Sequence, residues 1–122
     1  MRRLLWIDCV SALVAGTLLL ALSGWLDGLL GLPLWFVVGE GLVNLAYGTF
    51  SFSLARKPMP KQTQITGLAV ANGMWAALCL ALAVALFGKV TPLGTIHFAI
   101  GALYVGTLGV LEWRHRDALS AP

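Results

Sequence analysis

The chain has 122 residues, of which 59% are hydrophobic and 11% are charged, and its formal net charge is +3. Four long apolar stretches occupy most of this length, so no separate soluble domain remains on which a basic surface could bind nucleic acid. We therefore predict an all-α integral membrane protein with no nucleic-acid partner.

Each apolar stretch has the length of a membrane-spanning helix. The stretches cover residues 4–22, 33–54, 65–87 and 95–111. A helix that rises about 1.5 Å per residue needs about 20 apolar residues to cross a hydrocarbon core of ~30 Å. The connections, residues 23–32, 56–64 and 88–94, are short and contain Gly or Pro. Because short connections make consecutive helices antiparallel neighbours, we predict a single four-helix transmembrane domain over residues 1–122, folded as an up-down bundle.

The first stretch has an alternative interpretation as a cleaved signal peptide. Arg2 and Arg3 precede an apolar core, and small residues follow it near Ala21. The apolar core is longer than that of a usual signal peptide, and Asp8 interrupts its start. We therefore expect a retained helix, in which Asp8 lies close enough to the membrane surface to pair with Arg2 or Arg3.

The positions of the Lys and Arg residues predict the orientation in the membrane. Seven of the eight lie before the first helix, in the second connection or after the fourth helix: Arg2, Arg3, Arg56, Lys57, Lys61, Arg114 and Arg116. Lys89 alone lies in the third connection. Because short cytoplasmic loops are enriched in Lys and Arg, we predict cytoplasmic N- and C-termini and a location in the bacterial inner membrane.

The second predicted helix carries one polar stripe. Its members, spaced i, i+4, i+7 and i+11, are Glu40, Asn44, Tyr47 and Ser51. A charged carboxylate at the centre of a membrane costs about 2.5–3.5 kcal/mol on insertion scales, so this stripe is expected to face protein or water rather than lipid. Gly41 and Gly48 flank the stripe and allow another helix to approach closely.

The other predicted helices have small or polar faces at the same spacing. These faces are Asp8, Ala12, Ala15 and Leu19 in the first helix, Asn72, Ala76, Cys79 and Ala83 in the third, and His97, Gly101 and Tyr104 in the fourth. Counting residues from the helix ends places Glu40 and His97 at a similar depth, so we expect their side chains to be in contact. The candidate residues for binding a ligand or an ion are Glu40, Asn44, Tyr47, Asn72, His97 and Tyr104.

The sequence predicts no metal site, no cofactor and no enzymatic activity. His97 is the one histidine within the predicted membrane region, and no second nitrogen or sulfur ligand has a compatible spacing. No Ser or Cys has a His and a carboxylate at a matching depth. Cys9 and Cys79 are expected at different depths and are interpreted as packing residues.

Two classes of function remain. The first is a non-catalytic accessory, assembly or ligand-binding membrane component, in which the polar stripes specify helix packing. The second is a small transporter or channel protomer that uses Glu40 as a proton or cation site. A cavity reaching Glu40 favours transport, whereas a closed bundle with Glu40 fully hydrogen-bonded favours packing. Because lipid supplies no hydrophobic drive between helices, the expected partners are the lipid bilayer and either further copies of the chain or a larger membrane complex.

Overall fold

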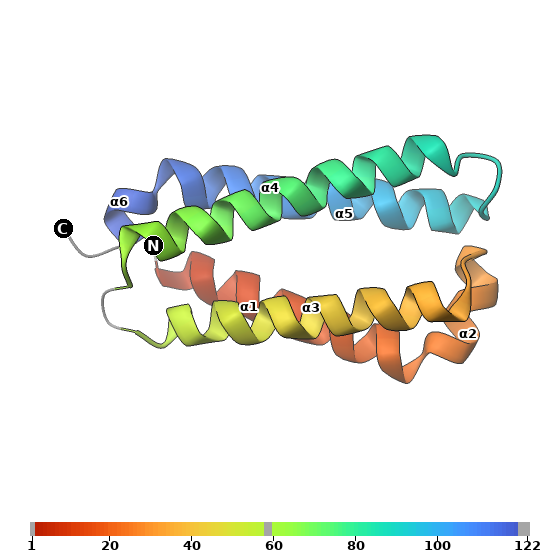
Figure 1. Ribbon diagram of the computed structural model, residues 1–122, viewed down its shortest axis with the longest axis horizontal. Coiled ribbons are helices and arrows are strands. Elements are labelled where there is room, and N and C mark those ends of the chain that lie inside the picture. The colour runs from red at the N-terminus through yellow and green to blue at the C-terminus, as the bar shows by residue number, and fades with distance from the viewer. Residues whose placement is uncertain (1, 58–59, 120–122) are drawn as a thin grey trace.

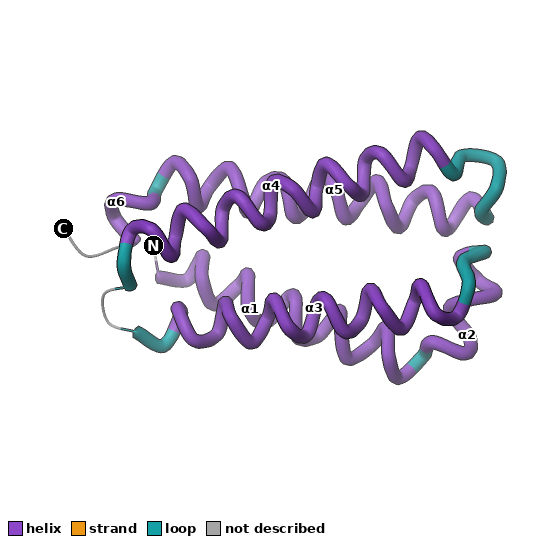
Figure 2. The backbone as a smooth tube through the Cα atoms, viewed as in Figure 1, coloured by secondary structure: helices purple, strands orange, loops and turns teal. Residues whose placement is uncertain are grey.

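The computed structural model describes residues 2–57 and 60–119, and its described residues form helices and short connections without a strand (Figure 2). The helices are α1 (Arg2–Ala21), α2 (Ser23–Leu30), α3 (Leu34–Ala55), α4 (Gln62–Ala85), α5 (Pro92–Arg114) and α6 (Arg116–Leu119). The predicted all-helical class is therefore confirmed for this part of the chain.

The four long helices are arranged as two antiparallel pairs (Figure 1). Helix α1 packs along α3, and α4 packs along α5, whereas contacts between the two pairs are sparser. The start of α1, the connection from α3 to α4, and α6 lie at one end of the molecule, which we call the terminal end (Figure 1). Helix α2 and the connection from α4 to α5 lie at the opposite end, which we call the α2 end.

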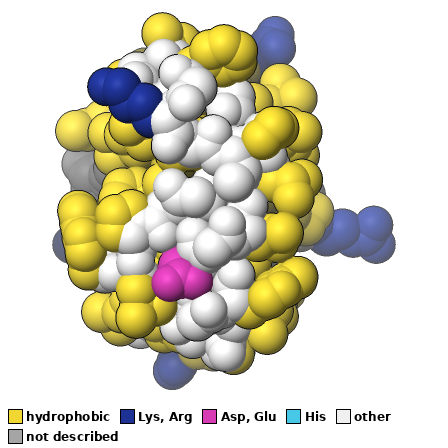
Figure 3. Space-filling model, turned by 90° about the vertical axis from the view of Figure 1, so that its right-hand side faces the viewer, with side chains coloured by type: hydrophobic (Ala, Val, Ile, Leu, Met, Phe, Trp, Pro, Cys, Tyr) yellow, Lys and Arg dark blue, Asp and Glu magenta, His cyan; other side chains and the backbone are white. Residues whose placement is uncertain are grey.

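The helices suit a membrane by length and composition. Helices α1, α4 and α5 are each long and apolar enough to cross a bilayer, and α2 and α3 pass the same test together although the chain bends by 116° between them. The described residues thus contain three potential spans, or four if the bent pair is one span. Large apolar side chains point outward, including Trp35, Val84 and Leu103, which are 75%, 73% and 75% exposed. Viewed from the α2 end, hydrophobic side chains cover the flanks of the molecule (Figure 3).

The segment expected to be a loop between the first two spans is largely helical, so that prediction was wrong. Gly24 and Gly28 do not interrupt this helix, and nothing lies within 4 Å of a Cβ added to either; α2 ends at Leu30, and Gly31 caps it with a left-handed φ of 71°. Leu26 and Leu30 follow each other at i, i+4 and pack into the hydrophobic cluster at the α2 end. The burial of these leucines outweighs the low helix propensity of glycine.

Helix α5 is longer than predicted at both ends. It begins at Pro92, where the Thr91 side chain accepts a hydrogen bond from the backbone N–H of Gly94 at 3.1 Å, and it ends at Arg114 rather than at residue 111. The predicted end was the last residue before a charged side chain, Glu112. In the structure Glu112 is fully buried, because its carboxyl group meets a hydrogen-bond donor on α4.

Small residues lie where the helices of each pair meet. A Cβ atom added to Gly16 of α1 would lie 2.8 Å from the carbonyl oxygen of Gly41 on α3. In the second pair, glycines of α5 lie against the predicted small face of α4: Gly101 against Cys79, Gly106 against Ala76, and Gly109 against Asn72. The helix backbones therefore approach closely within each pair, as small residues allow in membrane proteins.

Replacing Gly16 with Ala is expected to destabilise the fold by about 1–3 kcal/mol, because the added methyl group meets the rigid backbone of α3. Gly39→Ala is the matched control, since nothing lies within 4 Å of a Cβ at Gly39 and alanine is the better helix former. Unfolding of the purified protein in mixed detergent micelles would measure both changes. Equal stability of the two variants would contradict the close contact between α1 and α3.

Candidate functional site

A cavity of about 350 Å³ lies between the two helix pairs. All six residues predicted to bind a ligand or an ion line it: Glu40, Asn44, Tyr47, Asn72, His97 and Tyr104. The α1 face predicted from the sequence contributes as well, since Asp8, Ala12, Ala15 and Leu19 line the cavity. The structure thus brings residues from the predicted face of each long helix to one space, although Ser51 of α3 and Ala76 and Ala83 of α4 do not line it.

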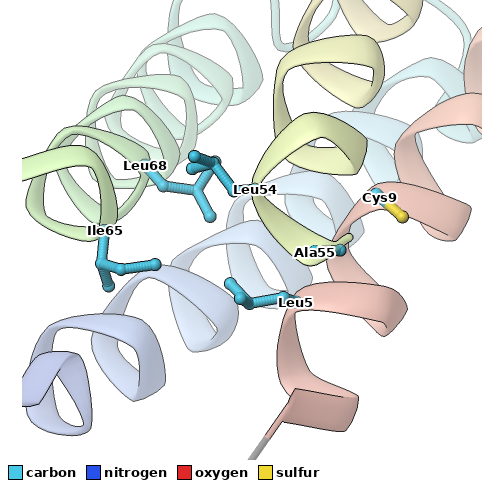
Figure 4. Close-up of a cluster of buried hydrophobic side chains, with 6 residues drawn as sticks. All are labelled: Leu5, Cys9, Leu54, Ala55, Ile65 and Leu68. Atoms are coloured by element: carbon cyan, nitrogen blue, oxygen red, sulfur yellow. The ribbon is translucent and has the colours of Figure 1, made fainter. Parts of the chain in front are cut away.

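Two hydrophobic clusters lie on either side of the polar residues. The cluster at the terminal end joins three helices and consists of Leu5, Cys9, Leu54, Ala55, Ile65 and Leu68 (Figure 4). Leu54 of α3 and Leu68 of α4 meet near its centre (Figure 4). The cluster at the α2 end consists of Leu19, Leu30, Leu32, Val37, Cys79 and Phe98. The polar residues of the cavity lining therefore lie between two hydrophobic clusters.

Glu40 and His97 are in contact, as the sequence predicted. The Nε2 atom of His97 lies 2.8 Å from Oε2 of Glu40, within hydrogen-bond distance. The Glu40 side chain is 9% exposed and the His97 side chain 29% exposed. The pair joins α3 to α5 and so links the two helix pairs across the cavity.

Asn44 and Tyr104 line the cavity, and among the described residues neither is hydrogen-bonded to the Glu40 carboxyl group. The Nδ2 atom of Asn44 donates a hydrogen bond to the Glu40 backbone carbonyl at 2.9 Å, within α3. The Tyr104 hydroxyl and the Ser11 hydroxyl are hydrogen-bonded, which joins α5 to α1. Tyr104 is nevertheless 45% exposed, so this part of the cavity wall lies near the outside of a single copy.

A second polar cluster joins all four long helices nearer the terminal end. The Tyr47 hydroxyl donates to Oδ2 of Asp8 at 2.7 Å, and the Asn72 amide donates to the same oxygen at 3.1 Å. The amide also donates to Oε1 of Glu112 at 2.5 Å. Asp8, Asn72 and Glu112 are 2%, 3% and 0% exposed. Buried carboxyl groups in contact with one shared donor make this cluster the most polar part of the interior.

Sequence reasoning missed Glu112. For Asp8 it allowed a pairing with Arg2 or Arg3: a pair with Arg3 is not among the ion pairs of the described residues, and the side chain of Arg2 lies outside them. Asp8 points inward because Tyr47 and Asn72 supply donors there. The helical period could have placed Glu112 on the inward face, since it lies about three turns after Gly101 on the same face of α5.

A second cavity, of about 320 Å³, lies between α3 and α4. It shares Glu40, Val43, Trp75 and Cys79 with the first cavity, and its remaining lining is apolar apart from backbone: Trp35, Phe36, Gly39, Leu78, Leu82 and Phe98. Trp35 and Leu78 are exposed on the apolar outer surface. This crevice therefore connects the surroundings of Glu40 with the hydrophobic flank of the molecule.

Within residues 2–57 and 60–119, no group of three or more His, Cys, Asp or Glu side chains has the arrangement of a metal site. Cys9 and Cys79 are both free and belong to the two different hydrophobic clusters. Family models, curated proteins and solved structures give no match to this chain.

Proposed function

We propose that this chain is a small multi-pass integral membrane protein whose central cavity binds a small molecule with an apolar body and a positively charged amine. The observation that carries this proposal is the lining of the cavity. Asp8 and Glu40 are the acidic residues of that lining and His97 is its one ionisable base, while no Lys or Arg of the described residues contributes. Pockets for small ligands are mostly apolar with a few convergent polar groups, and this cavity has that character.

The charge of the lining favours a cation over an anion. A ligand ammonium group near Oε2 of Glu40 gains a charge-assisted hydrogen bond, whereas a carboxylate there would meet the Glu40 carboxylate. Trp75 and Phe98 line the adjoining crevice, and aromatic rings attract such a cation. The apolar crevice between α3 and α4 supplies a route by which a lipid-soluble amine reaches Glu40 from the bilayer.

Binding of three probes with the same carbon chain tests this proposal. Hexylamine, hexanol and hexanoate would be titrated into the detergent-solubilised protein by calorimetry, with the titration of empty micelles subtracted. We expect saturable binding of the amine, weaker binding of the alcohol and none of the carboxylate. Gly39→Phe is expected to weaken the amine signal, because the ring would fill the open crevice. Equal binding of all three probes would refute an acidic ligand site.

The same geometry supports transport as a second candidate function. The two acidic side chains of the lining lie at two levels of one cavity, Glu40 beside His97 and Asp8 beside the cluster that holds Glu112, so a cation or proton has more than one binding position along the helices. We propose that additional copies or a larger membrane complex accompany this activity. In a single copy the half-exposed Tyr104 would meet lipid, and a partner subunit would cover it.

We further propose that four spans place both termini in the cytoplasm of a bacterial cell. The helix ends that carry Arg3, Arg56, Lys61 and Arg114 lie together at the terminal end (Figure 1). Cytoplasmic loops are enriched in such residues.

A reporter enzyme fused to the C-terminus is expected to be active on the cytoplasmic side. A reporter inserted near Asp27 or Lys89 is expected to be active on the external side, because α2 and the connection from α4 to α5 lie at the opposite end of the molecule (Figure 1). Activity of paired cytoplasmic and periplasmic reporters in intact cells would measure this. An external C-terminus would contradict the four-span arrangement.

A further inference from the structure

The cluster of Asp8, Tyr47, Asn72 and Glu112 has an unusual balance of donors and acceptors. Its described donors are the Tyr47 hydroxyl and the Asn72 amide, and its acceptors are the four oxygens of two carboxyl groups. Oδ2 of Asp8 accepts two of the three hydrogen bonds, and Oε1 of Glu112 accepts the third. Oε2 of Glu112 is buried and has no hydrogen-bond partner among the described residues.

Neither carboxyl group has a positive partner among the described side chains. The ion pair recorded for the described residues joins Glu40 to His97, and no described Lys, Arg or His nitrogen lies within 4.0 Å of the carboxyl oxygens of Asp8 or Glu112. The groups that face the pair from the helices around it are Tyr47 from α3, and from α4 the neutral Asn72. Cys9 follows Asp8 on α1 and is buried in the adjacent apolar cluster. Two negative charges in this surrounding would be uncompensated, and a buried charge without a partner is strongly unfavourable.

A proton resolves this imbalance. Two carboxyl groups that share a site cannot both ionise readily, and one proton between them leaves a single negative charge and adds a donor. We propose that Asp8 and Glu112 form a carboxyl pair that binds one proton, at a site separate from Glu40 and His97. Asn72 and Tyr47 position this pair through the hydrogen bonds they donate. This inference does not rest on the proposed amine ligand.

The arrangement of Asn72 favours a proton over a metal cation. Its Nδ2 atom lies between the two carboxyl groups, 3.1 Å from Oδ2 of Asp8 and 2.5 Å from Oε1 of Glu112. A cation held by both carboxylates would take that position, and the N–H donors would then point at a positive charge. A proton on one carboxyl group instead provides a hydrogen bond for a carboxyl oxygen to which the Asn72 amide does not donate.

Release of this proton changes the charge of the cavity. Asp8, Tyr47 and Asn72 belong both to the carboxyl cluster and to the cavity lining. Loss of the proton adds a negative charge beside the cavity, and binding of the proton removes it. The pair therefore sets the charge at the terminal end of the cavity according to pH.

Infrared difference spectroscopy of the purified protein tests the proposal without any ligand. The wild-type protein is expected to show the C=O stretch of a protonated carboxylic acid at neutral pH, where exposed carboxyl groups are ionised. The band intensity of one carboxylic acid should be lost in Glu112→Gln and in Asp8→Asn. The remaining carboxyl group is then ionised, because its neighbour is an uncharged amide that supplies N–H donors. Asp27→Asn is the control, since Asp27 lies in α2 outside the cluster, and should leave the band unchanged.

A milder variant covers the case in which the single replacements do not fold. Tyr47→Phe removes one donor to Asp8 while keeping the ring, and is expected to shift the position of the band without abolishing it. The absence of the band from the wild-type protein would overturn the proposal, as would its persistence in both Glu112→Gln and Asp8→Asn. Loss of the band in Glu40→Gln alone would assign the proton to Glu40 and would equally overturn it.

Discussion

Replacing Asn72 with Ala is expected to destabilise the folded protein by about 3 kcal/mol. A hydrogen bond to a charged group is worth about 1.5–3 kcal/mol and one to a neutral group about 0.5–1.5 kcal/mol, and one of each is lost from a carboxyl pair that holds one proton. The change leaves Glu112 without a hydrogen-bond donor among the described residues and leaves Asp8 with Tyr47 alone. Alanine introduces no clash, because it keeps the Cβ atom of Asn72 and adds no atom. That Cβ atom lies 3.1 Å from the position that a Cβ atom on Gly109 would take.

Asn44→Ala is the matched control for this replacement. The Asn44 amide donates within its own helix, to the Glu40 carbonyl, so its loss is expected to cost less than about 1 kcal/mol. Unfolding in mixed detergent micelles, followed by tryptophan fluorescence, would measure both variants. Combining Asn72→Ala with Glu112→Leu should cost less than the sum of the two single changes, since the stranded carboxyl group is then gone. Equal losses for Asn72→Ala and Asn44→Ala would show that the cluster does not stabilise the fold.

The contact between Glu40 and His97 was predictable because it depends on two quantities that the sequence supplies, the depth of each residue and the helix face on which it lies. The edges of an apolar stretch give the depth of each residue through the helical rise, and the 3.6-residue turn gives its face. Both residues lie well inside their helices, so small errors in the helix ends did not matter. The same reasoning placed all six candidate residues on inward faces, and the structure brings them to one cavity.

Glu112 was missed because hydropathy defines an apolar segment and not a helix. A charged residue ends the apolar stretch, but the backbone of α5 continues for as long as its side chains find partners. That partner, Asn72, is 40 residues away in the chain, and its distance from Glu112 depends on how α4 and α5 pack. A local pattern does not contain this information.

The cavity itself also could not be predicted from the sequence. Its volume depends on how far the two helix pairs stand apart, and that separation is set by bulky contacts at both ends, such as Leu54 with Leu68 and Phe36 with Phe98. Helical periodicity shows which faces turn inward, but the size of the space between them follows from side-chain packing. The sequence therefore left packing and transport open. A cavity reaching Glu40 was the feature expected to favour transport over packing, and the same cavity is the basis of the proposed ligand site.

Replacing Glu40 with Gln is expected to weaken hexylamine binding by roughly 30-fold, which corresponds to about 2 kcal/mol. The amide has the shape of the carboxyl group and still accepts a hydrogen bond, so the loss reports the missing charge. The amine should then bind no better than hexanol, whose affinity is expected to change little. Asp27→Asn removes an acidic charge that does not line either cavity and should leave all three probes unaffected.

Glu40→Leu separates ligand binding from packing. It removes the charge and also the hydrogen bond to His97 that links α3 to α5, so it is expected to weaken both amine binding and the stability of the fold, the latter by roughly 1–2 kcal/mol. If Glu40 served packing alone, Glu40→Gln would keep the wild-type stability and the wild-type order of probe affinities, and only Glu40→Leu would differ. Calorimetric titration and micellar unfolding of both variants distinguish these outcomes. In reconstituted vesicles, Glu40→Gln should also abolish any proton-coupled uptake of the amine, because a side chain that does not titrate cannot exchange a proton for the ligand.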